Sequence, residues 1–188
     1  MKTTTFKSIT VAISLGAIVF INACSPPKEV DKLTLVGKIV IDMEDSATTN
    51  KKDGDAHGGN YFSRADSGNI YAAGSIFNIP DSVMQKDIRV KINAWVRIGD
   101  LSSDKKFAIS LEDGAGNSMN WSQIDFRSHV SEANKWVNVI DSVTLPGNLI
   151  TKSGAVIKTY SFNPDGKSTL DCDDIELTFV KVEKIKVE

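Results

Sequence analysis

Cysteine and histidine are scarce in this 188-residue sequence. It contains two cysteines, Cys24 and Cys172, and two histidines, His57 and His129. Two cysteines give no disulfide framework, so we expect an ordinary hydrophobic core to hold the fold together. The histidines do not stand in a zinc-binding spacing, and the sequence has no Gly-x-Ser-x-Gly motif. These absences exclude the usual sequence signatures of zinc enzymes and α/β-hydrolases.

Net charge and aromatic content are low as well. The chain has 24 acidic and 22 basic side chains, and its formal net charge of −2 gives no indication of nucleic-acid binding. Aromatic residues make up 7% of the chain, which leaves few rings for an extended polysaccharide cleft. No segment shows a sustained helical period, so the predicted fold class is all-β.

The N-terminal segment has the layout of an export signal. Lys2 and Lys7 give it a positive start, and an apolar run follows from Ile9 to Ile21. That run is shorter than the ~20 residues that a membrane-spanning helix needs, which weighs against an uncleaved anchor. Ala23 and Cys24 then resemble the lipobox of bacterial lipoproteins, in which the cysteine receives a lipid and becomes the mature N-terminus. An ordinary secretory signal is the alternative.

The resemblance to lipoproteins implies three parts. Residues 1–23 would be a cleaved signal peptide, 24–32 the lipidated Cys24 with a polar tether, and 33–188 one β-sandwich domain. The N-terminal lipid would attach the chain to a membrane of the bacterial cell envelope. Ser25 follows the cysteine where an aspartate would favour retention in the inner membrane, so the outer membrane is favoured.

Alternating side chains predict strands along most of residues 33–188. The segment Arg89–Ile98 is the clearest case, because every second residue is apolar and the residues between are charged, polar or aromatic. This period of two is that of a strand with one face on a core. Asp113–Asn117 has the composition of a hairpin loop between two such segments. Short strands separated by turns predict an antiparallel β-sandwich or barrel.

Cys172 is the remaining candidate nucleophile. It lies among Asp171, Asp173 and Asp174, and neighbouring carboxylates raise the pKa of a thiol and so disfavour the thiolate. We therefore interpret Cys172 as a half-buried strand residue and predict no catalytic residues. A carboxylate pair for glycoside hydrolysis is the less favoured alternative, because 24 acidic residues allow many pairs and no spacing singles one out.

Two acidic clusters lie at the two ends of the predicted domain. Asp42–Asp45 follows the first predicted strand, and Asp171–Asp174 opens the last one. The first and last strands of a sandwich are often neighbours, so these carboxylates are expected to converge. Converging carboxylates suit Ca²⁺, which takes carboxylate and carbonyl oxygens as ligands. The alternative is two solvated strand ends that pair with lysines.

Five short motifs follow one another along the predicted domain, at residues 42–44, 56–61, 93–97, 134–137 and 173–177. They read Asp-Met-Glu, Ala-His-Gly-Gly-Asn-Tyr, Asn-Ala-Trp-Val-Arg, Asn-Lys-Trp-Val and Asp-Asp-Ile-Glu-Leu. Their order and spacing resemble those of the galactose-binding-like jelly rolls, a group that includes many carbohydrate-binding modules. The resemblance implies that the sandwich is a jelly roll.

The same resemblance implies a structural calcium ion that joins the first and last strands. It maps the metal to Glu44 and Asp173. Asp42 and a backbone donor near Asn60 complete our set of candidate calcium ligands. The sequence departs from the pattern at Met43, where such modules have a phenylalanine.

Carbohydrate binding requires an aromatic ring flanked by polar groups. Trp95 lies on the polar face of its predicted strand, beside Asn93 and Arg97, and Trp121 would extend this platform if its strand is adjacent. We therefore predict that Trp95, Arg97, Asn93 and Trp121 bind a glycan. The alternative is that the tryptophans pack under a loop or against the other sheet. Trp136 alternates with apolar residues and is predicted to lie in the core.

The sequence thus predicts a non-catalytic, lipid-anchored envelope protein whose jelly-roll domain binds carbohydrate. One alternative is a structural adaptor that docks an envelope protein partner and exposes an apolar patch for it. Another is a small glycan-active enzyme, which would need two carboxylates facing each other across a groove.

Overall fold

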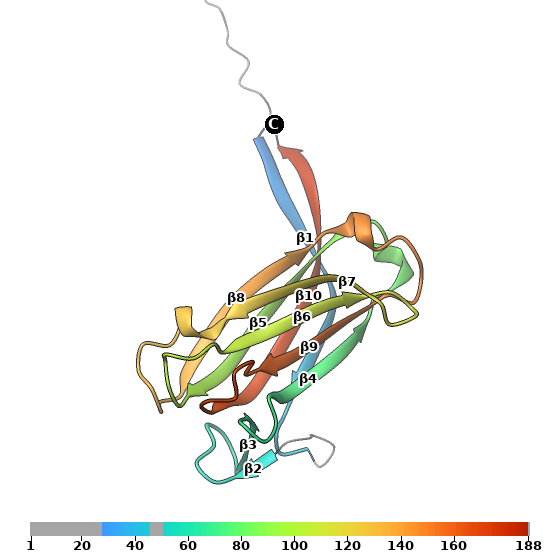
Figure 1. Ribbon diagram of the computed structural model, residues 1–188. Coiled ribbons are helices and arrows are strands. Elements are labelled where there is room, and N and C mark those ends of the chain that lie inside the picture. The colour runs from blue at the N-terminus through green and yellow to red at the C-terminus, as the bar shows by residue number, and fades with distance from the viewer. Residues whose placement is uncertain (1–27, 46–50, 188) are drawn as a thin grey trace, which may run out of the picture.

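The computed structural model describes residues 28–45 and 51–187, which fold into two antiparallel β-sheets packed face to face (Figure 1). The first sheet has the order β2-β3-β10-β5-β8, with β1 also paired to β10, and the second has the order β4-β9-β6-β7. The all-β sandwich predicted from the sequence is confirmed. The predicted signal peptide, residues 1–23, and Cys24 lie outside the described residues.

The strands account for most of the described chain. The first sheet contains β1 (Lys28–Ile41), β2 (Lys51–Asp53), β3 (Tyr61–Ala65), β5 (Asp87–Ile98), β8 (Val137–Leu145) and β10 (Leu170–Val187). The second contains β4 (Tyr71–Asn78), β6 (Lys106–Glu112), β7 (Ser118–Asp125) and β9 (Val156–Phe162). The short 3₁₀ helices are η1 (Asp81–Val83), η2 (Phe126–Ser128) and η3 (Gly147–Leu149). Within the described ranges, no helix is long and apolar enough to span a bilayer.

The strand order is that of a jelly roll. Along the chain, β3, β5, β8 and β10 enter the first sheet, whereas β4, the β6–β7 hairpin and β9 enter the second. The four-stranded halves β3-β10-β5-β8 and β4-β9-β6-β7 therefore face each other, as in other jelly rolls built from two Greek keys. This order agrees with the fold that the motifs implied.

The core lies between the sheets and follows from the period of two. In β5, every second side chain from Ile88 to Ile98 is buried, and the others are exposed or half-buried. Phe77 of β4 stacks on Phe179 of β10, with ring centroids 4.0 Å apart and planes at 6°, so the two sheets are joined by aromatic packing. Burial of apolar side chains therefore holds the sandwich together.

The tether expected over residues 24–32 is in part a strand. β1 begins at Lys28, which pairs with Val187 at the end of β10. Figure 1 shows the start of β1 and the end of β10 leaving the sandwich as a two-stranded ribbon. Asp31 fastens this ribbon to β5, because its carboxylate accepts a hydrogen bond of 2.9 Å from Arg89.

Gly74 lets β4 approach β9 at a shift in their register. A Cβ atom at this position would lie 2.2 Å from the carbonyl oxygen of Thr159 and 2.9 Å from Cβ of Tyr160. We predict that Gly74→Ala lowers the free energy of unfolding by about 1–3 kcal/mol, because the backbone must shift to make room. Urea unfolding followed by circular dichroism measures this. Gly114→Ala is the control, since its Cβ would meet nothing closer than 3.5 Å; equal stability of the two variants would contradict the prediction.

Candidate functional site

The two carboxylates predicted to bind calcium are both held by the loop between β2 and β3. Oε1 of Glu44, just after β1, accepts the backbone N–H groups of Asn60 and Tyr61, each at 2.8 Å. Oδ2 of Asp173, on β10, accepts those of residues 57 and 58 at 2.9 and 3.1 Å. The loop thus joins the first and last strands of the sandwich, which is the role that the resemblance assigned to calcium.

Hydrogen bonding and burial shift the pKa values of these carboxylates in opposite directions. The N–H groups of Asn60 and Tyr61 lower the pKa of Glu44, whose side chain is exposed. Asp173 is 2% exposed, and burial raises its pKa even though it accepts backbone N–H groups. The N–H groups of the loop therefore stabilise the ionised form of Glu44. For Asp173 they offset only part of the cost of burying its negative charge.

Calcium at this end of the sandwich stays a prediction. Among residues 28–45 and 51–187, no three His, Cys, Asp or Glu side chains gather as a metal-binding group. Oε1 of Glu44 and Oδ2 of Asp173 each accept two N–H groups, which uses both lone pairs of each atom. Oε2 of Glu44 accepts the side-chain amide of Asn60 at 3.5 Å, and Oδ1 of Asp173 accepts the backbone N–H of Asp174 at 2.9 Å, so each oxygen retains one lone pair. Asp42 instead accepts the backbone N–H of Glu44 at 2.9 Å.

Arg97 takes part in an ion-pair network with two aspartates. Its Nε lies 2.9 Å from Oδ2 of Asp171, and its Nη1 lies 2.7 Å from Oδ2 of Asp55. Asp171 is buried and also accepts two bonds from Arg64, at 2.6 and 2.9 Å. The Arg97 side chain is 11% exposed. Its guanidinium group therefore fastens the β2–β3 loop to the sheet, and its role in glycan binding stays a prediction.

Trp136 covers this network, and the prediction that it lies in the core is wrong. The guanidinium carbon of Arg97 lies 4.5 Å from the Trp136 ring centroid. The indole Nε1 donates a hydrogen bond of 3.1 Å to the carbonyl oxygen of Asp55. Trp136 precedes β8, which begins at Val137, so the alternation of that strand does not decide where its side chain lies.

Trp95 and Asn93 line a pocket on the outer face of the first sheet. The pocket has a volume of about 320 Å³ and lies over β1, β5, β8 and β10. The ring of His57 stacks on Trp95, with centroids 3.7 Å apart and planes at 12°. Nδ1 of His57 lies 3.0 Å from Oδ2 of Asp174. We call this site the Trp95 pocket; it is lined by Val40, Asp42, Asn93, Trp95, Asn138, Asp174 and Glu176.

Trp121 lies on the second sheet, so it does not extend the surface around Trp95. It belongs to β7, which pairs with β6, whereas Trp95 belongs to β5 of the first sheet. The prediction of one platform depended on adjacent strands, and the strand order corrects it. The two tryptophans lie on opposite outer faces of the sandwich.

The outer face of the second sheet carries an aromatic surface of its own, which we call the Trp121 face. Trp121 is 45% exposed on β7, and Tyr71 is 47% exposed on β4. Tyr71 stacks on Phe162, with centroids 5.3 Å apart, whereas Ala108 and Ser110 of β6 are small and buried. The strand registers give three rows across this face: Trp121, Ser110, Lys158 and Ile76; Gln123, Ala108, Tyr160 and Gly74; and Asp125, Lys106, Phe162 and Tyr71.

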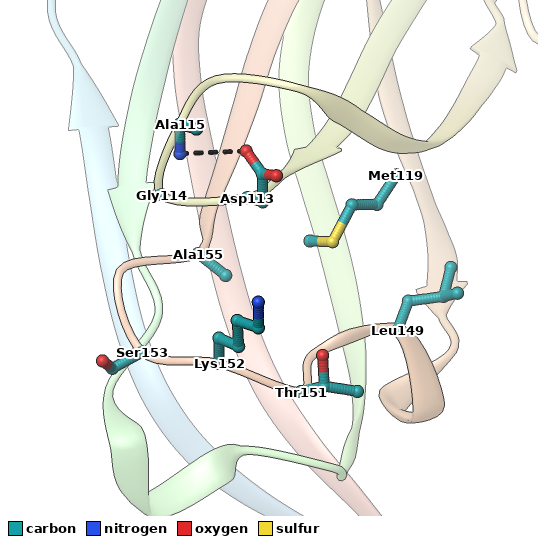
Figure 2. Close-up of a pocket in the computed structure, with 9 residues that line it drawn as sticks. All are labelled: Asp113, Gly114, Ala115, Met119, Leu149, Thr151, Lys152, Ser153 and Ala155. Atoms are coloured by element: carbon teal, nitrogen blue, oxygen red, sulfur yellow. Dashed lines mark hydrogen bonds between the residues drawn. The ribbon is translucent and has the colours of Figure 1, made fainter.

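A further pocket, of about 330 Å³, lies between the β6–β7 loop and the segment before β9 (Figure 2). Figure 2 shows Lys152 extending its ammonium group into the opening, across from Met119 and Leu149. Asp113 folds back onto its own loop and accepts the N–H of Ala115 at 2.9 Å. The lining residues, Asp113, Gly114, Ala115, Met119, Leu149, Thr151, Lys152, Ser153 and Ala155, include no aromatic ring on which a sugar could stack.

Cys172 does not have the environment of a nucleophile. Its side chain is fully buried in the core, and burial raises the pKa of the thiol to about 12. The hydroxyl group of Ser161 donates a hydrogen bond of 3.1 Å to its sulfur atom. The thiol is therefore protonated at neutral pH and serves as an apolar core side chain.

Comparison with known proteins finds likeness in fold only. No protein-family model and no curated protein matches the sequence. Among solved structures, the chain is similar to the xylan-binding domains CBM22-2 and CBM22-1 of Paenibacillus barcinonensis Xyn10C, with 14% and 16% identity and TM-scores of 0.46 and 0.40. The matches cover 74% and 88% of this chain and 98% and 100% of those domains.

A third similar structure is that of TmCBM61 in complex with β-1,4-galactotriose. Its identity is 16% and its TM-score 0.34, with 78% of this chain and 86% of that chain covered.

Asp171 is the buried carboxylate that Arg64 and Arg97 share, so its removal should destabilise the fold. We predict that Asp171→Ala lowers the free energy of unfolding by about 3–5 kcal/mol, since it leaves two guanidinium groups without their buried partner. Asp55→Ala is the matched control: Asp55 also binds Arg97, but its side chain is 88% exposed. Chemical unfolding of both variants measures the difference. A loss for Asp171→Ala no larger than that for Asp55→Ala would contradict the prediction.

Proposed function

We propose that this chain is a non-catalytic carbohydrate-binding protein and that the Trp121 face binds the glycan. The observation that carries the proposal is the arrangement of its rings. Trp121 on β7 and Tyr160 on β9 flank the small side chains Ala108 and Ser110 of β6. Neighbouring strands lie ~4.8 Å apart, so the strands that carry the two rings are separated by about 10 Å. Trp121 is exposed and Tyr160 half-buried on this outer face, so sugar rings can stack on the two aromatic side chains from the solvent side.

The polar side chains of this face suit the hydroxyl groups of a sugar. Lys158 lies beside Ser110 on the neighbouring strand, and its Nζ is 2.6 Å from Oε2 of Glu112. Gln123 is exposed on β7, two residues from Trp121. Ammonium, carboxylate and amide groups supply both donors and acceptors, and an aromatic ring contacts the apolar C–H face of a sugar. Together they form a surface that binds a neutral oligosaccharide by stacking and hydrogen bonding.

The proposal places the domain on the cell envelope. Lipid attachment at Cys24, with the outer membrane favoured, would present the sandwich to glycans on a membrane surface. The β1–β10 ribbon supports this, because it extends away from the sandwich and contains Lys28, the first described residue. Docking of an envelope protein partner and a small glycan-active enzyme stay the alternative predictions.

Removal of the exposed indole tests the function. We expect Trp121→Ala to weaken binding of a neutral hexasaccharide, identified by a glycan array, about tenfold in isothermal titration calorimetry; this corresponds to about 1.4 kcal/mol. Ile140→Ala is the control, because Ile140 is 68% exposed but lies on β8 of the other sheet. No binding to any arrayed glycan, or equal affinity of the Trp121→Ala and wild-type proteins, would overturn the proposal.

Calcium is the proposed structural ligand at the β2–β3 loop, with Oε2 of Glu44 and Oδ1 of Asp173 as its available carboxylate oxygens. We expect Ca²⁺ to raise the melting temperature of chelator-treated protein, because an ion that binds the folded state stabilises it. Glu44→Gln should abolish that rise, while its amide oxygen can still accept the N–H groups of the loop. A melting temperature that Ca²⁺ does not change would rule out the stabilising site.

A further inference from the structure

The Trp95 pocket is separate from the Trp121 face. It lies on the outer face of the first sheet, and the hydrophobic core separates the two surfaces. Its volume of about 320 Å³ is at the lower end of the range of small-molecule sites, about 300–1,000 Å³. A pocket of this size accommodates one sugar residue or one chain end.

The β2–β3 loop fixes the tryptophan of this pocket in place. His57 covers one side of the Trp95 indole at a centroid distance of 3.7 Å, and Trp136 meets His57 edge-on at 6.4 Å. The His57 backbone N–H binds Asp173, and its ring binds Asp174. The indole is therefore held before a ligand arrives, and little side-chain freedom remains to be lost on binding.

The charges around the pocket define which sugars it takes. Its lining includes the carboxylates of Asp42, Asp174 and Glu176, and none of the described lining residues is basic. Lys38, outside the lining, pairs with Glu176 at 2.8 Å, so the three carboxylates outnumber the one lysine bound to them. The Asn138 side-chain amide donates a hydrogen bond of 2.8 Å to Oδ1 of Asn93. Carboxylate and amide oxygens accept hydrogen bonds from sugar hydroxyl groups, whereas a sugar that carries its own carboxylate is repelled.

We infer that the Trp95 pocket is a second carbohydrate-binding site, which takes a single neutral sugar residue and excludes uronic acids. The inference rests on the proposed function for the chemical class of its ligand. His57 is the positioning residue of this site. Glu176 accepts hydrogen bonds from sugar hydroxyl groups, and Asn138 accepts or donates them. With one site on each outer face, the chain binds glycans at two independent places.

Indole N–H signals in the NMR spectrum of ¹⁵N-labelled protein separate the two sites, because the chain has three tryptophans. The probes are galactose, glucose, mannose and xylose, glucuronic acid, and the hexasaccharide that binds in the array. We expect at least one neutral monosaccharide to shift the Trp95 signal in wild-type and Trp121→Ala protein. Glucuronic acid should leave it unchanged.

Four further variants guard against misfolding of a Trp95→Ala protein. Asn138→Ala should weaken the monosaccharide effect at least fivefold, and Lys91→Ala should leave it unchanged, because Lys91 lies on the same face outside the pocket. His57→Ala should weaken it, and His57→Phe should restore it, because phenylalanine can stack on the indole.

The outcomes distinguish this inference from the proposed function. In one outcome, no sugar shifts the Trp95 signal but the hexasaccharide shifts the Trp121 signal. This result overturns the second site and agrees with the proposed function. If no sugar shifts the Trp95 signal or the Trp121 signal, both the second site and the proposed function are wrong. Equal binding of glucuronic acid and a neutral monosaccharide overturns the proposed selectivity.

Discussion

Two buried carboxylates on β10, Asp171 and Asp173, determine the arrangement at this end of the sandwich. They lie on the outer face of the sheet, whereas Cys172 between them points into the core. A buried carboxylate is costly unless it is paired or hydrogen-bonded. Asp171 is paired with two guanidinium groups, and Asp173 is bound by N–H groups of the β2–β3 loop. The loop is therefore fixed over β5, and this fixes His57 against the indole of Trp95.

The sequence was sufficient to predict the parts of the fold that depend on local alternation. The strict period of two in Arg89–Ile98 correctly separated the buried side chains of β5 from the outward ones, including Trp95 and Asn93. The turn residues Asp113–Asn117 correctly marked the β6–β7 hairpin. The jelly-roll strand order was predicted from the motif resemblance, because the alternation alone is equally compatible with a β-barrel.

The rest depends on contacts between segments far apart in the chain, which no local pattern encodes. A period of two shows that Trp121 points outward, but it does not tell which of two sheets holds its strand. Arg97 alternates like Trp95, yet its guanidinium is engaged by Asp171, 74 residues away. The contact of Trp136 with Asp55 joins residues 81 apart. Two acidic residues on one strand, with buried apolar neighbours, were the available signal for this network.

The proposal of two sites follows from the layered fold and from the different charges on its two surfaces. The Trp95 pocket has three carboxylates in its lining, one of them paired with Lys38, and one indole that already stacks on His57. The Trp121 face mixes acidic and basic side chains, such as the Glu112–Lys158 pair, beside several rings. Packed sheets lie about 10 Å apart, and distant substitutions usually act additively. Each surface can therefore have its own selectivity, because a side chain on one outer face makes no contact with a ligand on the other.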